Sequence, residues 1–198
     1  MMRARSLSAA LATVALAACG HSGAAATDVK SVGCLPGERG FLQASLRGAL
    51  QADLDWRGPM IECEGGARPD GSGIRLSVAG KTPDGQSLRL VFGIAVHPGE
   101  SATRALPTNL TVIVENQSRV FSTLGDARCT VESVVQQALP TADDTATRSK
   151  NVPGYRVAAR GFCVAPATTL DGAERLYVDR FDVAALARFT EEDLKHAP

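Results

Sequence analysis

The chain has 198 residues, with 21 Lys and Arg against 21 Asp and Glu, and 44% of its residues are hydrophobic. This balance provides no basic patch for nucleic acid or for an anionic surface, so it excludes both as electrostatic targets. The length is sufficient for one domain with a hydrophobic core.

The first 18 residues have the pattern of an export signal. Arg3 and Arg5 form a basic start, and the apolar run LSAALATVALAA follows. The run is shorter than the roughly 20 residues that a membrane-spanning helix needs. We therefore expect a cleaved signal peptide over 1–18, whose removal leaves a slightly acidic chain.

This signal ends in Leu16-Ala17-Ala18-Cys19. The stretch resembles the lipobox of bacterial lipoproteins, in which Leu and two small residues precede a cysteine. The resemblance implies a diacylglyceryl group on the Cys19 sulfur and a further acyl chain, such as palmitate, on its amino group. Two or more acyl chains hold a protein stably at a membrane. An ordinary secreted protein, in which Cys19 has no such role, is the alternative.

The next residue, Gly20, stands where an inner-membrane retention signal would place Asp. By that rule of the lipoprotein family, the protein is expected at the outer membrane, facing the periplasm. Residues 19–33 are small and polar, and they predict a flexible tether.

The other four cysteines are expected to form disulfides, because the periplasm is oxidising. Three pairings are open to four cysteines, and the sequence does not choose among them. We favour Cys34–Cys63 and Cys129–Cys163, since each pair links neighbours along the chain. Metal binding is the weaker interpretation, because the cysteines are scattered and no histidine is near them.

The first predicted element is an amphipathic helix from Glu38 to about Asp53, where apolar residues recur at helical spacing. Trp56 follows it and is expected to cover the sheet as a core residue. The apolar positions of this predicted helix are Phe41, Leu42, Leu46, Ala49 and Leu50.

After Pro59 the apolar period becomes two, which is typical of strands with one buried face. The segment 129–137 also fits a helix, but its β-branched residues favour a strand. A short helix is predicted to start near Thr190. The main predicted strands cover 74–79, 88–96, 110–115, 119–123, 129–137, 155–165 and 174–183.

Turn motifs set the predicted pairing of these strands. The sequence PDG at 69–71 and again at 83–85 predicts two turns, because Pro, Asp and Gly each favour a turn position. A five-residue loop at the second turn would place Leu76 opposite Leu90 and Val78 opposite Leu88.

These patterns together predict a mostly β fold: a single antiparallel β-sandwich of about eight strands with one N-terminal amphipathic helix. The domain would span 34–189. Residues 190–198 would form a C-terminal tail or short helix.

Histidine supplies no catalytic motif in this chain. His97 lies in the turn HPGE, with no G-x-S-x-G motif elsewhere, and is interpreted as a loop residue. Asp143 and Asp144 are interpreted as a solvated acidic loop, because they lack the regular oxygen spacing of a calcium site. We therefore predict no catalytic residue, no metal site and no cofactor.

Paired carboxylates are more numerous. Glu62 and Glu64 would share one face of a strand, and Asp179 and Asp182 flank Arg180 and Phe181. Acid pairs perform glycosidase chemistry, but the chain holds only 2 Tyr and 1 Trp to line a sugar cleft. Surface salt bridges are the favoured interpretation.

Arginines at alternating strand positions offer a second hypothesis. Arg75, Arg89, Arg156 and Arg160 should all face outward, where they could grip phosphate or sulfate. Arg156 and Arg160 would be about 13 Å apart on one strand. They cannot form a joint clamp unless another strand contributes, so ordinary surface charge is favoured.

The sequence thus predicts a non-enzymatic, lipid-anchored envelope lipoprotein that binds or scaffolds an envelope protein partner. Strand addition at an exposed sheet edge is one mode of such binding. A module that binds a glycan or a lipid head group is the alternative, and a hydrolase whose site no motif reveals is a third possibility.

Overall fold

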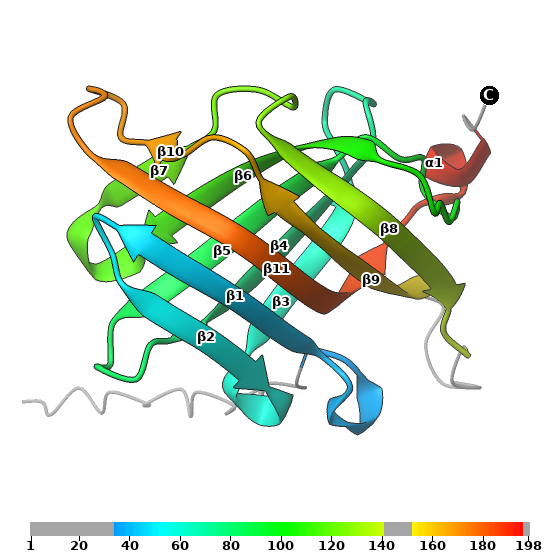
Figure 1. The fold of residues 1–198 in the computed structure, drawn as a ribbon. Helices are drawn as coiled ribbons and strands as arrows, with labels where there is room; N and C mark the ends of the chain where they lie inside the picture. The colour runs from blue at the N-terminus through cyan, green and yellow to red at the C-terminus, as the bar shows by residue number, and fades with distance from the viewer. Residues whose placement is uncertain (1–33, 141–151, 196–198) are drawn as a thin grey trace, which may run out of the picture. The chain divides into compact units, whose positions relative to one another are not determined.

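The computed structural model describes residues 34–140 and 152–195 (Figure 1). The predicted signal peptide, Cys19 and most of the predicted tether lie outside these residues. So do Asp143 and Asp144. Within the described residues, eleven strands form one antiparallel sheet. The predicted mostly β class is confirmed, although the sheet has more strands than the eight expected.

The elements are bounded as follows. The strands are β1 Phe41–Gly48, β2 Ala52–Arg57, β3 Glu62–Ala67, β4 Ile74–Lys81, β5 Ser87–Ile94, β6 Leu106–Val114, β7 Arg119–Ser122, β8 Cys129–Ala138, β9 Gly154–Cys163, β10 Ala167–Thr168 and β11 Arg175–Arg188. The short helical segments are η1 Pro36–Glu38, η2 Gly58–Met60, η3 Glu115–Gln117 and α1 Glu191–Lys195.

Two long strands, β6 and β11, each pair with two different strands along one edge. β11 pairs with β1 on one side and with both β10 and β9 on the other. β6 pairs with β5 on one side and with both β7 and β8 on the other. The sheet therefore bends over itself. In Figure 1, β2, β1, β11, β9 and β8 form a front layer that crosses β3, β4, β5 and β6 behind it.

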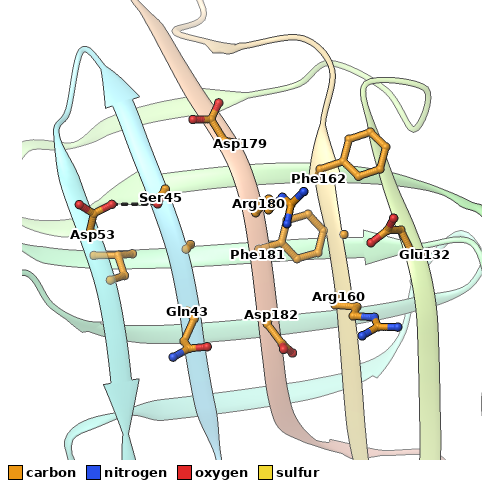
Figure 2. A pocket seen from close by; sticks show the side chains of 13 residues that line it. Gln43, Ser45, Asp53, Glu132, Arg160, Phe162, Asp179, Arg180, Phe181 and Asp182 are labelled. Atoms are coloured by element: carbon orange, nitrogen blue, oxygen red, sulfur yellow. Dashed lines mark hydrogen bonds between the residues drawn. The ribbon is translucent and has the colours of Figure 1, made fainter.

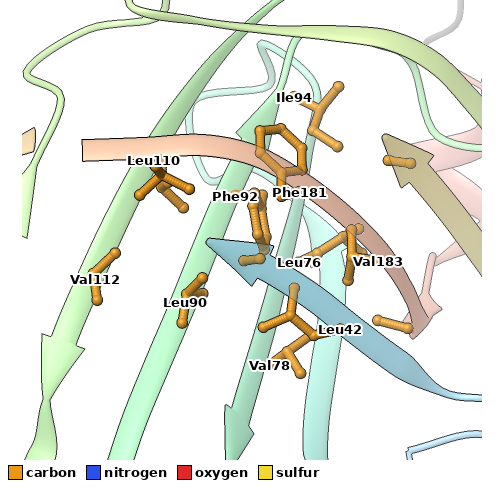
Figure 3. Close-up of a cluster of buried hydrophobic side chains, with 14 of the residues drawn as sticks. Leu42, Leu76, Val78, Leu90, Phe92, Ile94, Leu110, Val112, Phe181 and Val183 are labelled. Atoms are coloured by element: carbon orange, nitrogen blue, oxygen red, sulfur yellow. The ribbon is translucent and has the colours of Figure 1, made fainter. Parts of the chain in front are cut away.

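The hydrophobic core lies between the front layer and the strands behind it (Figure 3). Leu90 and Phe92 of β5 are fully buried, in the alternation that the sequence predicts. The rings of Phe92 and Phe181 of β11 meet with centroids 4.8 Å apart, so they join the two layers directly. Aromatic pairs at this separation add about 0.5–1.5 kcal/mol beyond the area they bury.

The predicted N-terminal helix is wrong. The segment from Glu38 to Asp53 contains η1, β1 and the start of β2. Leu42, Ala44 and Leu46 are buried at a spacing of two. Leu42 and Leu46 are four residues apart, a spacing that fits both a helix and a strand. β1 is extended because it hydrogen-bonds between β2 and the distant β11, which local spacing does not reveal.

The predicted hairpin between β4 and β5 has the correct faces but the wrong register. Leu76 lies opposite Phe92, and Val78 lies opposite Leu90, two residues from the predicted pairing. The loop is fixed by Thr82, whose backbone N–H donates to the Gln86 carbonyl at 2.9 Å. Its hydroxyl also accepts the Gln86 N–H at 2.9 Å. This side-chain closure sets where the strands begin.

Several local predictions are confirmed. Segment 129–137 is a strand, β8, and the glycines of both PDG turns have positive φ, +70° at Gly71 and +86° at Gly85. Trp56 is buried and donates its indole N–H to the Lys81 carbonyl at 2.7 Å. A short helix, α1, follows Thr190.

Both favoured disulfides are present in the structure. Cys34–Cys63 joins the segment before β1 to β3, and Cys129–Cys163 joins β8 to β9. Cys63 also lies beside β11, since its Sγ accepts the Leu186 N–H at 3.3 Å. Cross-links between residues 29 and 34 positions apart each stabilise a fold by roughly 3.5 kcal/mol in the loop-entropy model.

Candidate functional site

An open concavity lies on the outer face of the front layer, away from the core (Figure 2). It is an open groove of about 880 Å³ that crosses β2, β1, β11, β9 and β8. We call it the outer groove. Its polar lining consists of Gln43, Ser45, Asp53, Glu132, Arg160, Asp179, Arg180 and Asp182.

A bulge in β11 forms the centre of the outer groove. Ala44 pairs with Phe181 and Leu46 pairs with Val178, so β11 has one residue more than β1 over this stretch. Asp179 and Arg180 are consecutive, and both are exposed. A bulge shifts the strand's alternation by one residue. It therefore places two neighbouring charged side chains on the same outer face.

A second bulge lies two strands away in β8. Val131 pairs with Gly161, but Ser133 pairs with Arg160, so Glu132 is the extra residue. Val131 and Val134 are both buried while Glu132 between them is exposed. The carboxylate of Glu132 consequently lines the far side of the outer groove.

Gly161 of β9 sits between the two bulges. It pairs with Phe181 of β11 on one side and with Val131 of β8 on the other. A methyl group at this position would lie 2.1 Å from the Thr130 carbonyl oxygen and 2.9 Å from Cζ of Phe181. Only glycine leaves room for such an approach. Gly161 thus allows the three strands to pack closely beneath the outer groove.

Two arginines in the outer groove have no ion pair. Arg160 and Arg180 are both exposed. Within the described residues, neither has a carboxylate oxygen within 4.0 Å, and neither side chain makes a hydrogen bond. Figure 2 shows Arg180 beside the half-buried ring of Phe162. The guanidinium groups remain available to an anionic ligand.

The carboxylates of the groove differ in their surroundings. Asp182 is half-buried, and burial raises the pKa of its carboxyl against the opposing effect of nearby Arg160, Arg156 and Arg57. Its neighbours across the sheet are Gln43 on β1 and Arg160 on β9. Asp182 is therefore poorly solvated but has no close ion pair in the described part of the chain.

At the β2 end, by contrast, the carboxylate is already bonded within the protein. Asp53 accepts hydrogen bonds from the Ser45 hydroxyl at 2.8 Å and from the Arg47 guanidinium at 2.7 Å. The Ser45 bond, followed by the Arg47 bond, lowers the pKa of Asp53. The unpaired charges therefore lie from β11 to β8.

The two predicted acid pairs lie in different surroundings. Glu62 and Glu64 do share the exposed face of β3, where Glu64 pairs with Arg75 at 3.2 Å and Glu62 approaches Arg89 at 3.9 Å. They form the surface salt bridges expected from the sequence. Asp179 forms no such salt bridge within the described residues, and it lines the outer groove with Asp182.

The four arginines predicted to face outward also differ in their surroundings. Arg75 and Arg89 are held by carboxylates, the latter also by Glu115 at 2.8 Å. Arg156 and Arg160 lie on the same outer face of β9, but only Arg160 lines the outer groove. The second strand that a clamp requires is β11, which contributes Arg180.

His97 lies in the loop after β5, as predicted. It lines a smaller cavity of about 260 Å³ together with Arg68 and the α1 residues Glu192 and Asp193. The lining of this cavity includes no serine or threonine. Asp193 accepts the backbone N–H of Thr190 at 2.7 Å, which caps α1. Asp193 thus serves the fold of the C-terminal turn.

Sequence reasoning missed the groove itself, and with it the roles of Glu132 and Gly161. A signal for both bulges was present. Val131-Glu132-Ser133-Val134 and Val178-Asp179-Arg180-Phe181 each place two polar residues between apolar ones. In a strand, such a pair marks a change of phase and hence a bulge.

In residues 34–140 and 152–195, no three His, Cys, Asp or Glu side chains come together as a metal site, and no helix has the length and apolarity to cross a membrane. No protein-family model, curated protein or solved structure matches the chain.

Proposed function

We propose that this protein is a lipid-anchored lipoprotein of the bacterial outer membrane that binds an envelope protein, without enzymatic activity, through the outer groove. In this proposal, acyl chains on Cys19 hold the chain at the membrane and residues 19–33 tether the folded domain. The domain itself acts as a sandwich, with the front layer presenting its outer face to the partner.

The observation that carries the proposal is the set of unpaired charges in the outer groove. Arg160, Arg180, Asp179 and Glu132 lie in one concavity, and none has an ion pair among the described residues. Charged groups at an interface give specificity by meeting complementary charges on the partner. The open form of the groove suits a segment of another protein better than a buried small molecule.

A glycan or a lipid head group is the second candidate. Phe162 is half-buried beside Arg180, and an aromatic ring next to charged and amide groups also suits a sugar or a phosphate ester. Gln43, on the opposite side of the groove, provides the amide. A test must therefore identify whether the molecule bound in the groove is a protein, a glycan or a lipid.

Site-specific photo-cross-linking in intact cells tests the proposal. A benzophenone amino acid would replace Gln43 or Glu132, at opposite sides of the outer groove. The same substitution at Glu62 is the matched control, because Glu62 is exposed on β3. We expect both groove positions to capture the same envelope protein and the Glu62 position not to capture it.

Other outcomes would contradict the proposal. Capture of a lipid or a glycan from Gln43 and Glu132, with no protein adduct, would favour the second candidate. Equal capture of one protein from Glu62 and from the groove would show that recognition does not use the groove. Mass spectrometry that finds no acyl group on Cys19 of the native chain would show that the proposed lipid anchor is absent.

A further inference from the structure

Arg160 and Arg180 lie on neighbouring strands and are close enough to act on one ligand. Asp182 pairs directly with Arg160, so Arg180, two residues earlier on β11, lies diagonally across from it. Diagonal neighbours in an antiparallel pair have Cα atoms about 7–8 Å apart. Two flexible arginine side chains from such positions can reach the same carboxylate or adjacent carboxylates.

Carboxylates surround this arginine pair on both sides. Asp179 precedes Arg180, Asp182 follows it, and Glu132 lies beyond Arg160 on β8. Asp179 and Glu132 are exposed and have no ion pair among residues 34–140 and 152–195. The charges of the groove thus alternate in sign instead of forming a uniformly basic patch.

This alternation decides between classes of partner. A uniformly anionic membrane surface would meet the arginines but would be repelled by the three carboxylates beside them. A flat bilayer also fits a concave groove poorly. A peptide segment can place an acidic side chain at the arginines and basic side chains at the acids, so that no charge meets a like charge.

We infer that the outer groove recognises an extended peptide segment in which acidic side chains are flanked by basic ones. The acidic side chains would be bound by Arg160 and Arg180, and the basic ones by Asp179 and Glu132. The exposed part of the Phe162 ring would contact the apolar stem of a long side chain. This inference rests on the proposed function and names the chemistry of the partner segment.

The test uses synthetic fluorescein-labelled peptides and the full chain, purified in detergent, at low ionic strength. The mixed-charge probe is Lys-Gly-Glu-Glu-Gly-Lys, and all-acidic and all-basic hexapeptides are compared with it by fluorescence anisotropy. We expect the mixed-charge peptide to bind at least tenfold more tightly than either of the others. The double variant Arg160→Gln/Arg180→Gln should weaken that binding at least tenfold.

Arg156→Gln is the matched control, because Arg156 has the same outward-facing phase of β9 but does not line the groove. It should change the affinity less than twofold. An equal loss with Arg156→Gln, or tightest binding of the all-acidic peptide, would show diffuse electrostatic attraction and overturn the inference. Displacement of the peptide by soluble glycerophosphoglycerol would indicate a lipid head-group site and overturn it as well.

The two proposals can fail separately. If no peptide binds but Gln43 and Glu132 capture one envelope protein in cells, the proposed function stands and the charge pattern inferred here is wrong. If the mixed-charge peptide binds but cells yield no protein adduct, the groove has the inferred chemistry and the proposed cellular role is wrong.

Discussion

Replacing Gly161 by alanine should disrupt the front layer beneath the outer groove. The new methyl group would lie 2.1 Å from the Thr130 carbonyl oxygen and 2.9 Å from Cα of Val131. Both atoms belong to the backbone of β8, which pairs with β9 on this side. Relief of the clash therefore requires strands to separate, because no side-chain rotation can provide it.

The expected cost follows from this geometry. Overpacking of a core costs about 1–3 kcal/mol, and a clash with backbone belongs at the upper end. We expect Gly161→Ala to lower the free energy of unfolding by about 3 kcal/mol. At about 2–4 °C per kcal/mol for a domain of this size, the melting temperature should fall by roughly 6–12 °C.

Thermal unfolding of the oxidised protein, followed by circular dichroism, measures the effect. Gly154→Ala on the same strand is the control, because a methyl group there meets only the side-chain ends of Leu186, at 3.3 Å, and Leu139, at 3.6 Å. Its melting temperature should change by less than about 2 °C. A Gly161→Ala protein as stable as Gly154→Ala would refute the close approach of β8 to β9.

Three further predictions concern stability. Trp56→Phe removes the indole hydrogen bond to the Lys81 carbonyl and should cost about 2 kcal/mol, measured by urea unfolding. Replacement of both Cys129 and Cys163 by alanine should cost about 3.5 kcal/mol in the same assay, while mass spectrometry of the unmodified protein should find no free thiol at either position. Burial raises the pKa of Asp182, so the folded state holds this proton more tightly than the unfolded chain does, and stability is lost as the pH rises through the raised pKa. Relative to the unmodified protein, Asp182→Asn should therefore gain stability as the pH rises above 3.8, the ordinary pKa of an Asp side chain, and should show no gain at lower pH. A difference in urea unfolding that does not change with pH would contradict this.

Regular alternation was sufficient to predict β4 and β5, two of the strands behind the front layer. In β4 and β5, apolar residues occupy every second position, so the buried face follows from the sequence alone. The exact register does not, because faces repeat every two residues and a shift of two preserves them. Here the hydrogen bonds of Thr82 with Gln86 select one of the equivalent registers.

The front layer was harder to predict, because its strands depart from regular alternation. Val131 and Val134 of β8 are three residues apart, which resembles helical spacing and made this segment ambiguous. The bulge at Glu132 produces that spacing within a strand. In β1 the ambiguity has a different source, since Leu42 and Leu46 fit both periods and only pairing with β11 makes the segment extended.

The candidate site depends on these same departures. A local sequence signal marks each bulge, but it does not show that Glu132 and Asp179-Arg180 line one groove. They are close because β9 lies between β8 and β11, and because Gly161 has no side chain that would hold these two strands apart. Pairing between strands distant in the chain therefore creates the site. This explains why arginines on one strand gave no clamp in the sequence, whereas Arg160 and Arg180 on two neighbouring strands form the binding pair proposed for the folded protein.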